Sequence, residues 1–183
     1  RMRASCDASY NTHTDGKGHG GWIIGLGECE PALCTYGGKQ TIMGRSSTNA
    51  EYITYGDVVA HVEWFREIVE FAGQPQTEAV VIENDNAAAL NIANLPWPTK
   101  GVRHIISPHV HYFKDAIRRD RVRFVYRNTD DLESDLMTKP LVGAKFMKHN
   151  RRVREGIKYK DRPLLPPQPK IVMKSGLPEH LMA

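Results

Sequence analysis

A helical repeat of apolar residues lies in the first half of the chain and limits the folds that the chain can adopt. From about Thr48 to Ala72, apolar residues recur at the spacing of an amphipathic helix, which Gly73 and Pro75 then end. The apolar face consists of Ile53, Val58, Val59, Val62, Phe65, Ile68 and Val69. A long helix with one apolar face must pack on another layer. The flanking segments are therefore expected to supply a sheet.

Three segments before this helix have the composition of strands. They are Arg3–Tyr10, Gly20–Gly27 and Leu33–Tyr36, and the Gly-rich loop NTHTDGKGHG separates the first two. Loops of this kind join antiparallel neighbours. We expect these segments to form an antiparallel meander.

The segments after the helix alternate between strand and helix patterns. Strands are expected at Glu78–Asn84, which includes the buried run AVVI, and at Val122–Tyr126. Helices are expected at Asn86–Asn94, where Pro96 and Pro98 follow, and at His109–Arg119, Leu132–Thr138 and Gly143–Val153. This order predicts an α/β fold in which helices pack on a mixed five-stranded sheet.

The length of 183 residues suits one domain with an appendage. We expect the domain at residues 1–153 and a basic, Pro-rich extension at residues 154–183, where DRPLLPPQPK has the composition of an extended segment. Such an extension could dock on a larger complex.

The composition excludes several classes of protein. Hydrophobic residues make up 40% of the chain and charged residues 25%, as in soluble globular proteins. No apolar run approaches the roughly 18 residues of a membrane span, and no apolar signal segment precedes the first strand. We expect an intracellular protein, cytoplasmic or nuclear, that is neither secreted nor bound to a membrane.

The three cysteines, Cys6, Cys29 and Cys34, form an odd set that fits a reducing compartment. A zinc site would have to combine them with His109 and His111. The spacings C-x4-C and H-x-H lie far apart and match no standard finger, so structural zinc is not expected.

Basic residues crowd the second half of the chain. They are Arg118, Arg119, Arg121, Arg123, Arg127, Lys139, Lys145, Lys148, Arg151, Arg152 and Arg154. A phosphate backbone would bind such a stripe, since each neutralised phosphate releases counterions. A solvated basic face without a partner explains the same pattern, and charge alone leaves both interpretations open.

Four carboxylates stand where a strand ends or a helix begins, and each also has a structural explanation. Asp7 interrupts a strand of small residues, where acids are depleted, and its structural explanation is a solvated aspartate that faces the edge of the sheet. Glu51 fits a capping box with Thr48, and Asp85 could cap the helix that follows it. Asp135 follows other acids that could cap the same helix. Their joint occurrence favours a shared site.

Carboxylates brought together repel one another unless cations lie between them, and oxygen ligands select hard ions such as Mg²⁺. Two such ions about 4 Å apart can activate a water and stabilise the leaving oxygen of a phosphodiester. The four acids are therefore candidates for a phosphodiesterase centre.

These motifs resemble the ribonuclease H domain that closes the Pol polyprotein of copia-type LTR retrotransposons. The resemblance covers Ala4 to about Val153. It rests on SSTNAEYITYGDVVAHVEWFREI, IENDNAAALNIANLP, RHI with the later HYF, and DLMTKPL with Phe146 beyond. It departs from the family in the segment RHIISPHVHYF, in Asn84, which replaces a frequent acid, and in the absence of a histidine before Asp135.

The resemblance implies a ribonuclease H-like fold and hydrolysis of the RNA strand of RNA–DNA hybrids during reverse transcription. Asp7, Glu51, Asp85 and Asp135 would be the catalytic metal ligands for two Mg²⁺ ions, or Mn²⁺, and the domain would be fused to or associated with a reverse transcriptase. Candidate contacts to the nucleic acid, including ribose 2′-hydroxyls, are Ser9, Ser47, Asn49, Asn86 and Lys139. Ser46 and Thr48 lie beside them, and all the serine, threonine and asparagine candidates are equally explicable as turn and cap residues.

A rival hypothesis is a retroelement-derived domain that keeps the fold as a structural, nucleic-acid-binding component of a larger ribonucleoprotein. An α/β phosphatase or kinase is disfavoured, because the chain has no Gly-rich phosphate loop.

Overall fold

A computed structural model of the chain describes residues 1–27, 30–95 and 108–156, and in the last range it describes side chains from residue 111 on. The strands are β1 (Met2–Ser9), β2 (His19–Leu26), β3 (Ala32–Lys39), β4 (Val80–Asn84) and β5 (Val122–Tyr126). The helices are α1 (Ser47–Phe71), α2 (Ala87–Asn94), α3 (Pro108–Arg118), α4 (Asp135–Thr138) and α5 (Gly143–Glu155), with a 3-10 turn at Thr129–Asp131. Each predicted segment is found within a few residues of its expected bounds.

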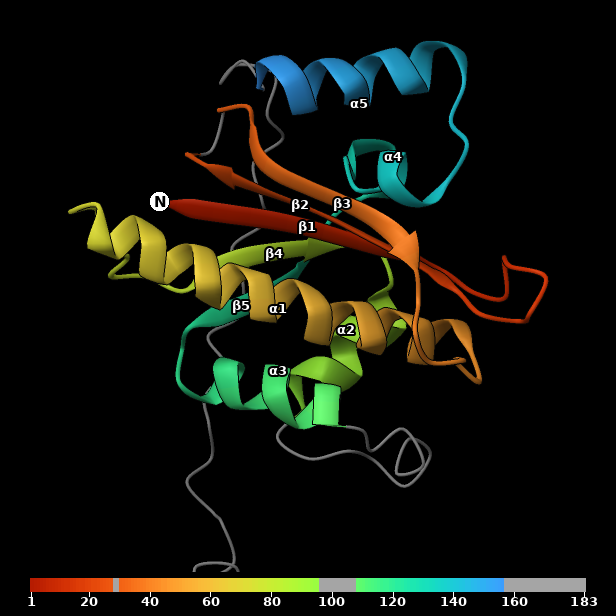
Figure 1. The fold of residues 1–183 in the computed structure, drawn as a ribbon, viewed down its shortest axis with the longest axis horizontal. Helices are drawn as coiled ribbons and strands as arrows, with labels where there is room; N and C mark the ends of the chain where they lie inside the picture. Colours follow the sequence, from red (N-terminus) through yellow and green to blue (C-terminus); the bar gives the residue numbers. More distant parts are fainter. Residues whose placement is uncertain (28–29, 96–107, 157–183) are drawn as a thin grey trace, which may run out of the picture.

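The five strands form one sheet in the order β3-β2-β1-β4-β5. Strands β1, β2 and β3 are antiparallel neighbours, whereas β4 lies parallel to both β1 and β5. Figure 1 shows α1 and α3 on one side of this sheet and α4 and α5 on the other. The predicted α/β fold with a mixed five-stranded sheet is confirmed.

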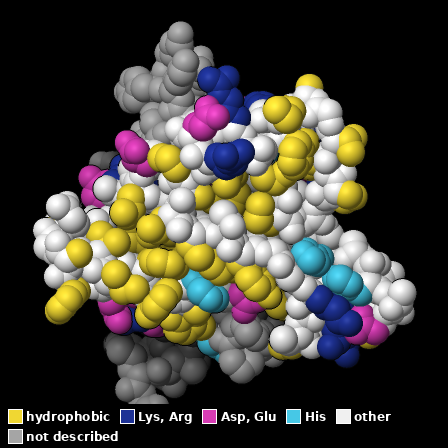
Figure 2. Space-filling model, turned by 45° about the horizontal axis from the view of Figure 1, so that its top comes forward, with side chains coloured by type: hydrophobic (Ala, Val, Ile, Leu, Met, Phe, Trp, Pro, Cys, Tyr) yellow, Lys and Arg dark blue, Asp and Glu magenta, His cyan; other side chains and the backbone are white. Residues whose placement is uncertain are grey.

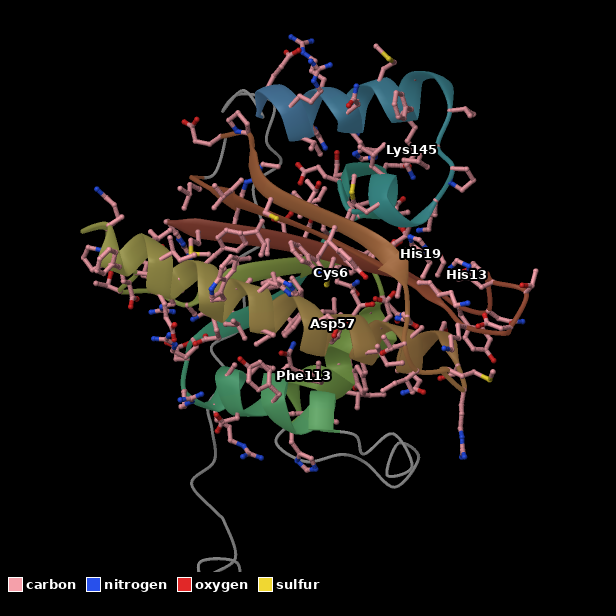
Figure 3. The ribbon with its side chains drawn as sticks, in the orientation of Figure 1. Cys6, His13, His19, Asp57, Phe113 and Lys145 are labelled. Atoms are coloured by element: carbon pink, nitrogen blue, oxygen red, sulfur yellow. The ribbon has the colours of Figure 1, made fainter. Side chains whose placement is uncertain are left out.

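The apolar core lies between the sheet and α1, α2 and α3. Tyr55 of α1 packs against Phe124 of β5 with ring centroids 4.5 Å apart, and Phe113 of α3 meets both rings. Cys6 is fully buried in this core as a free thiol, as its place in the first strand predicts. Figure 3 shows Cys6 and Phe113 on the same side of the sheet.

The opposite face of the sheet is covered through ion pairs. Arg3 of β1 contacts Glu133 at 3.3 Å, and Nε of Arg127 donates to Glu83 of β4 at 3.0 Å. All four of these side chains are buried. A buried ion pair gains little net stability against its desolvation, but it fixes the partners in one arrangement. The segment that leads into α4 is thus held in register with the sheet.

Two glycines let α4 approach the sheet closely. A Cβ atom at Gly21 of β2 would meet Cβ of Met137 at 2.5 Å, and one at Gly37 of β3 would meet the carbonyl oxygen of Met137 at 2.6 Å. Real Cβ atoms do not approach other atoms that closely. Because glycine has no side chain, α4 can pack directly against the backbone of β2 and β3 at these two positions.

A buried lysine closes the C-terminal end of α2. Nζ of Lys114 donates to the carbonyl groups of Ile92, Ala93 and Leu95 at 2.8, 2.9 and 2.5 Å. The last carbonyls of a helix lack the full set of backbone partners, and here the carbonyl of Ile92 accepts only a weak bond of 3.3 Å from the amide of Leu95, so an ammonium group is well suited to this end. Burial, with the charge of Arg118, lowers the pKa of Lys114 to about 8.

The outer side of α1 also exposes large apolar residues near its C-terminal end. Trp64, Ile68 and Phe71 recur at helical spacing and are exposed, and Phe71 is 96% accessible. Figure 2 shows hydrophobic side chains spread over the face that is turned toward the viewer. The last turns of α1 are therefore apolar on two sides.

Some expectations fall outside the described residues. The predicted extension at 154–183 does so from residue 157 on, as do Pro96, Pro98, Cys29 and residues 103–107. None of the helices in the described ranges combines the length and the apolar character that a membrane crossing requires.

Candidate metal centre

Three of the four predicted acids converge beside the carboxyl end of β1. Asp7 lies on β1, Glu51 in the first turns of α1, and Asp85 directly after β4. Each offers one oxygen, and these oxygens lie within 4.8 Å of one another. Because β1 and β4 are parallel neighbours, their carboxyl ends bring Asp7 and Asp85 to the same edge. We call these three residues the carboxylate triad.

The capping explanation of Glu51 is wrong. The N-cap of α1 is Ser46, whose Oγ accepts the amide of Asn49 at 3.2 Å, and Oδ1 of Asn49 accepts the amide of Arg45 at 3.0 Å. The side chains of Ser46 and Asn49 thus accept the backbone amides at the start of α1, which a capping box would have assigned to Thr48 and Glu51. Glu51 is left to point inward, where it is 3% exposed.

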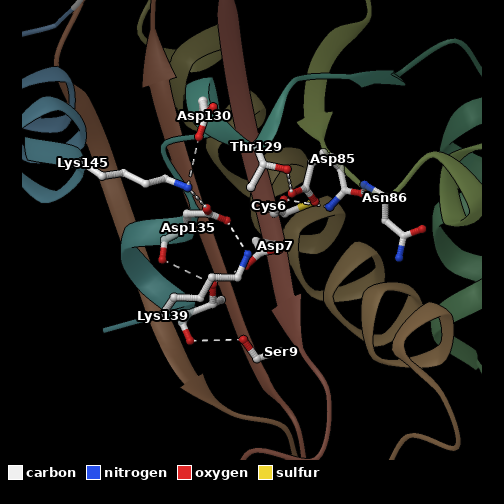
Figure 4. A network of polar contacts seen from close by, with 12 residues as sticks. Cys6, Asp7, Ser9, Asp85, Asn86, Thr129, Asp130, Asp135, Lys139 and Lys145 are labelled. Carbon is white, nitrogen blue, oxygen red and sulfur yellow. Dashed lines mark hydrogen bonds and ion pairs between the residues drawn. The ribbon is translucent and has the colours of Figure 1, made fainter. Parts of the chain in front are cut away.

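The capping explanation of Asp85 is also wrong. The N-cap of α2 is Asn86, whose Oδ1 accepts the amide of Ala89 at 3.0 Å. Oδ2 of Asp85 instead accepts a hydrogen bond of 2.7 Å from the hydroxyl of Thr129. Asp85 is therefore free of a capping role, and Thr129 orients it (Figure 4).

Asn84 holds Glu51 in place through a buried network. Its Nδ2 donates to Oε2 of Glu51 at 3.0 Å and to the carbonyl of Cys6 at 2.9 Å. Its Oδ1 accepts the hydroxyl of Tyr55 at 2.7 Å and the amide of Asn86 at 3.0 Å. All four hydrogen-bonding positions of the amide are used. The sequence marks Asn84 only as a departure from the family, and this role was not predicted.

The triad is electrostatically strained without a cation. Burial raises the pKa of Glu51 well above its ordinary value, and the charge of Asp7 adds to this, while the hydrogen bond from Asn84 opposes it. Burial likewise raises the pKa of Asp7, which the hydroxyl of Thr138 and the charge of Lys139 partly offset. Both shifts show an excess of negative charge in a desolvated place. A divalent cation would relieve it.

The donor set of the triad suits such a cation. It consists of carboxylate oxygens, which hard ions such as Mg²⁺ and Mn²⁺ prefer over the softer metals that seek thiolates or imidazoles. Among the described residues, no other group of three His, Cys, Asp or Glu side chains comes together in this way. The triad therefore fits one divalent ion.

The fourth predicted acid, Asp135, lies nearby but has other partners. It begins α4 and is fully buried. Its Oδ1 accepts Nζ of Lys139 at 2.6 Å, and its Oδ2 accepts Nζ of Lys145 at 3.0 Å. Lys139 also lies 3.3 Å from Oδ2 of Asp7, so one ammonium group links the triad to Asp135 (Figure 4).

Lys139 is held as a cation by these neighbours. Burial opposes its charge, but the hydrogen bond to Asp135 and the charge of Asp7 outweigh burial and raise the pKa of Lys139. Lys145 reaches the same carboxylate from α5, as Figure 3 shows beside α4. Lys145 lies ten residues after Asp135 without any local pattern that connects them, and the sequence did not indicate it as a site residue.

The hydroxyl groups around Asp7 come from the end of α4 and the end of β1. Oγ1 of Thr138 donates to Oδ2 of Asp7, and Oγ of Ser9 donates to the carbonyl of Thr138 at 3.2 Å. Ser9 and Lys139, two of the predicted nucleic-acid contacts, thus lie next to Asp7. Thr138 was not predicted, although its place three residues after Asp135 puts it on the same short helix.

The other predicted nucleic-acid contacts lie at helix starts. Ser47 is the first residue of α1 and is exposed, whereas Asn49 and Asn86 take part in the caps described above. Asn86 is half-buried beside Asp85 (Figure 4). The contact of these residues with a nucleic acid stays a prediction.

Many of the basic residues in the second half of the chain are already paired with acids. The pairs are Arg119–Asp115, Arg121–Glu63, Arg123–Asp120, Arg127–Glu83, Lys148–Asp131, Arg151–Glu155 and Arg152–Asp131. Several of these are surface pairs, which a phosphate can displace at little cost. The charge of this half is thus less concentrated than its composition indicates.

The comparisons with known proteins place this site in context. No family model matches the chain. The chain is similar to two retrovirus-related Pol polyproteins of Arabidopsis thaliana. It is 26% identical over 153 residues to the one from transposon RE2, a match that covers 83% of the chain, and 29% identical over 108 residues to the one from transposon RE1, which covers 59%. The matches span 10% and 7% of the length of these relatives.

Solved structures of ribonucleases H are also similar to the chain, at a TM-score of 0.48. One is LC11-RNase H1 in complex with an RNA/DNA hybrid, at 13% identity, where the match covers 75% of this chain and 93% of that chain. Another is the N-terminal RNase H domain of rv2228c from Mycobacterium tuberculosis, at 10% identity, with 82% and 98% covered. On the sequence comparison, the chain is a relative of the retrovirus-related Pol polyproteins of transposons, and this confirms the relationship that its motifs predicted.

Proposed function

We propose that the chain is a metal-dependent endonuclease that hydrolyses the RNA strand of RNA–DNA hybrids during the reverse transcription of a retrotransposon. The observation that carries the proposal is the convergence of Asp7, Glu51 and Asp85 within 4.8 Å, from three elements that are far apart in the sequence. The similarity to transposon Pol polyproteins supports the same activity. It also supports fusion to, or association with, a reverse transcriptase.

The triad would hold Mg²⁺ or Mn²⁺. Such an ion lowers the pKa of a bound water and so supplies a nucleophile near neutral pH. The chain's own part is to fix the ligands: Asn84 orients Glu51, Thr129 orients Asp85, and Thr138 orients Asp7. Partners of this kind tune both the direction and the basicity of ligands.

Selection of RNA would depend on contacts to ribose 2′-hydroxyls. Ser9 lies on the Asp7 side of the triad, and Ser47, Asn49 and Asn86 lie at the starts of α1 and α2. Lys139 is a cation that lies 3.3 Å from Oδ2 of Asp7, where it could meet a phosphate. We propose these five residues as the nucleic-acid contacts.

The test is cleavage of an end-labelled RNA–DNA hybrid in the presence of Mg²⁺. We expect the chain to cut the RNA strand and to leave a DNA duplex of the same sequence intact. Asp7→Asn should reduce the rate by about 100-fold or more, because it removes one of the three carboxylates of the triad. Asp15→Asn is the matched control, since Asp15 is an exposed carboxylate paired with Lys39 on the β1–β2 hairpin. It should cut like the unchanged chain.

Absence of cleavage by the unchanged chain, or equal cleavage by the Asp7 variant, would refute the proposal. Binding of the hybrid without cleavage would instead favour a structural, nucleic-acid-binding component of a ribonucleoprotein. Affinity measured over a range of salt concentrations reports how many phosphates are neutralised, since each contributes about 0.9 to the slope of the log–log plot.

A further inference from the structure

The surroundings of Asp135 hold more positive charge than those of the triad. Both oxygens of Asp135 accept lysine ammonium groups, from Lys139 at 2.6 Å and from Lys145 at 3.0 Å. In the triad, Lys139 lies 3.3 Å from Oδ2 of Asp7, and the other partners, Asn84, Thr129 and Thr138, are neutral. One acid thus has two ammonium partners, whereas the three acids of the triad share one.

A second divalent ion would have to bind between Asp7 and Asp135. Nζ of Lys139 is the group that lies there, 3.3 Å from Oδ2 of Asp7 and 2.6 Å from Oδ1 of Asp135. Oxygen ligands approach Mg²⁺ to about 2.1 Å, so the ion and the ammonium group cannot share this space. A second ion could enter only if Lys139 left.

Charge balance favours the lysines over a second ion. The four carboxylates carry four negative charges, which one divalent ion and two ammonium groups neutralise. Two divalent ions would neutralise the same carboxylates alone and leave Lys139 and Lys145 as unpaired cations beside them. Lys145 has a further acid, Asp130, at 3.8 Å, whereas within the described ranges the ion pairs of Lys139 are with Asp7 and Asp135. Displacing Lys139 would therefore take from this partly exposed cation both of these carboxylates, one of which is fully buried.

The fold also keeps Lys139 in this place. It follows α4 directly, and its own amide donates to the carbonyl of Asp135 at 3.0 Å. The close contact of Met137 with Gly21 and Gly37 fixes α4 on the sheet. Lys139 therefore approaches Asp7 from a rigid support rather than from a free loop.

We propose that Lys139 and Lys145 take the place of the second metal ion, so that this chain binds one divalent cation, at Asp7, Glu51 and Asp85. The inference rests on the proposed metal-dependent function. In this arrangement Asp135 holds the two lysines and is not a metal ligand. One ion and the ammonium group of Lys139 then stand where two ions were expected.

The test is to count bound Mn²⁺ on the whole chain, without nucleic acid, from the electron paramagnetic resonance signal of the unbound ion. We expect about one ion per chain, and Asp85→Asn should abolish this binding. Two ions of comparable affinity on the unchanged chain, or an ion that survives Asp85→Asn, would overturn the proposal.

Two further variants separate the roles of the lysines and Asp135. Lys139→Met combined with Lys145→Met keeps an unbranched side chain that is only one atom shorter and removes both charges, so a second ion should bind. Lys148→Met is the matched control, because Lys148 lies on the same helix as Lys145 but pairs with Asp131. The control should still bind about one ion. A double variant that also binds only one ion would contradict the proposal.

Asp135→Asn keeps the experiment decisive if the double lysine variant does not fold. The proposal expects this variant to bind about one ion, as before, because Asp135 is not a ligand. A drop in the number of bound ions would contradict it. Because ions are counted without a hybrid, a chain that binds one ion but cuts no RNA refutes only the proposed function. A chain that cuts RNA but binds two ions refutes only this inference.

Discussion

Nδ2 of Asn84 donates a hydrogen bond of 3.0 Å to Oε2 of Glu51, and this contact links the buried core to the carboxylate triad. Asn84 is fully buried on β4, and Tyr55 of the apolar core donates to its Oδ1. A group that accepted only could not make this arrangement, because both Glu51 and the carbonyl of Cys6 need a donor. An asparagine amide therefore suits position 84, because its NH₂ group can donate to the neighbouring carboxylate of Glu51.

Asn84→Asp should therefore destabilise the chain while it hardly changes its volume. The new carboxylate would leave two buried acceptors without a donor and would repel Glu51, at a cost of about 2 kcal/mol or more in the free energy of unfolding. Urea unfolding without metal measures this cost. Asn86→Asp is the control, since aspartate also caps helices well and should change stability by less than about 0.5 kcal/mol. Equal stability of the two variants would show that the donors of Asn84 are unimportant.

The raised pKa of Glu51 predicts how the stability of the metal-free chain depends on pH. The folded state binds this proton more tightly than the unfolded state, whose pKa is near the ordinary 4.5. The free energy of unfolding should therefore fall as pH rises above about 4.5 toward the raised pKa. Each unit of displacement corresponds to about 1.4 kcal/mol.

Glu51→Gln replaces the titratable carboxyl group with a neutral amide, whose oxygen can still accept the hydrogen bond from Asn84. The variant should be more stable than the unchanged metal-free chain at neutral pH, by on the order of 1 kcal/mol, and its stability should vary less between pH 5 and 8. It should also lose the stabilisation that Mg²⁺ confers. Thermal unfolding with and without Mg²⁺ measures both effects. An unchanged slope with pH would show that Glu51 does not cause it.

The hydroxyl of Thr129 predicts a change in metal affinity without a large change in stability. Thr129 is exposed, and its Oγ1 donates to Oδ2 of Asp85 at 2.7 Å. Thr129→Val should weaken Mn²⁺ binding by about 10-fold, because an unsupported ligand samples other directions. Thr129→Ser retains a hydroxyl and should bind nearly as well as the unchanged chain. Titration calorimetry with Mn²⁺ compares them, and equal affinity of the valine variant would argue against an orienting role.

The close contact at Gly21 predicts that a single methyl group displaces α4. In Gly21→Ala the new Cβ would overlap Met137, so the free energy of unfolding should fall by about 1–3 kcal/mol. Thr138 and Lys139 should then lose their contacts with Asp7, and the affinity of the chain for Mn²⁺ should change. Gly73→Ala is the control, since its positive φ of 82° makes alanine unfavourable by about 1 kcal/mol although no atom lies near. That variant should be less stable but bind Mn²⁺ as before.

The order and type of the elements follow from short-range pattern. The spacing of apolar residues in Thr48–Ala72, together with Gly73 as the residue that ends the helix, predicts α1 to within a residue at either end. Strand β5 has the predicted bounds, Val122–Tyr126. Burial of one face of a helix or strand produces a regular spacing of apolar residues, and this spacing can be read directly from the sequence.

The caps and the pairing of the acids depend on choices that local sequence leaves open. Ser46, Ser47 and Thr48 are all able to cap α1, and only the fold selects Ser46 and turns Glu51 inward. Asp85 and Asn86 compete in the same way at α2. Lys139 stands four residues after Asp135, a spacing at which ion pairs are common, and it was predicted as a nucleic-acid contact, not as a partner of this acid. Lys145 comes from the next helix, so no periodicity within one element could have revealed its contact with Asp135.

The ion pairs that attach the α4–α5 side to the sheet have a consequence for motion. The Arg3–Glu133 pair is buried, so pulling the two groups apart would leave two desolvated charges without partners. The segment before α4 should therefore separate from the sheet only when the sheet itself unfolds, and the cations beside the triad should keep their places for as long as β1 and β4 do.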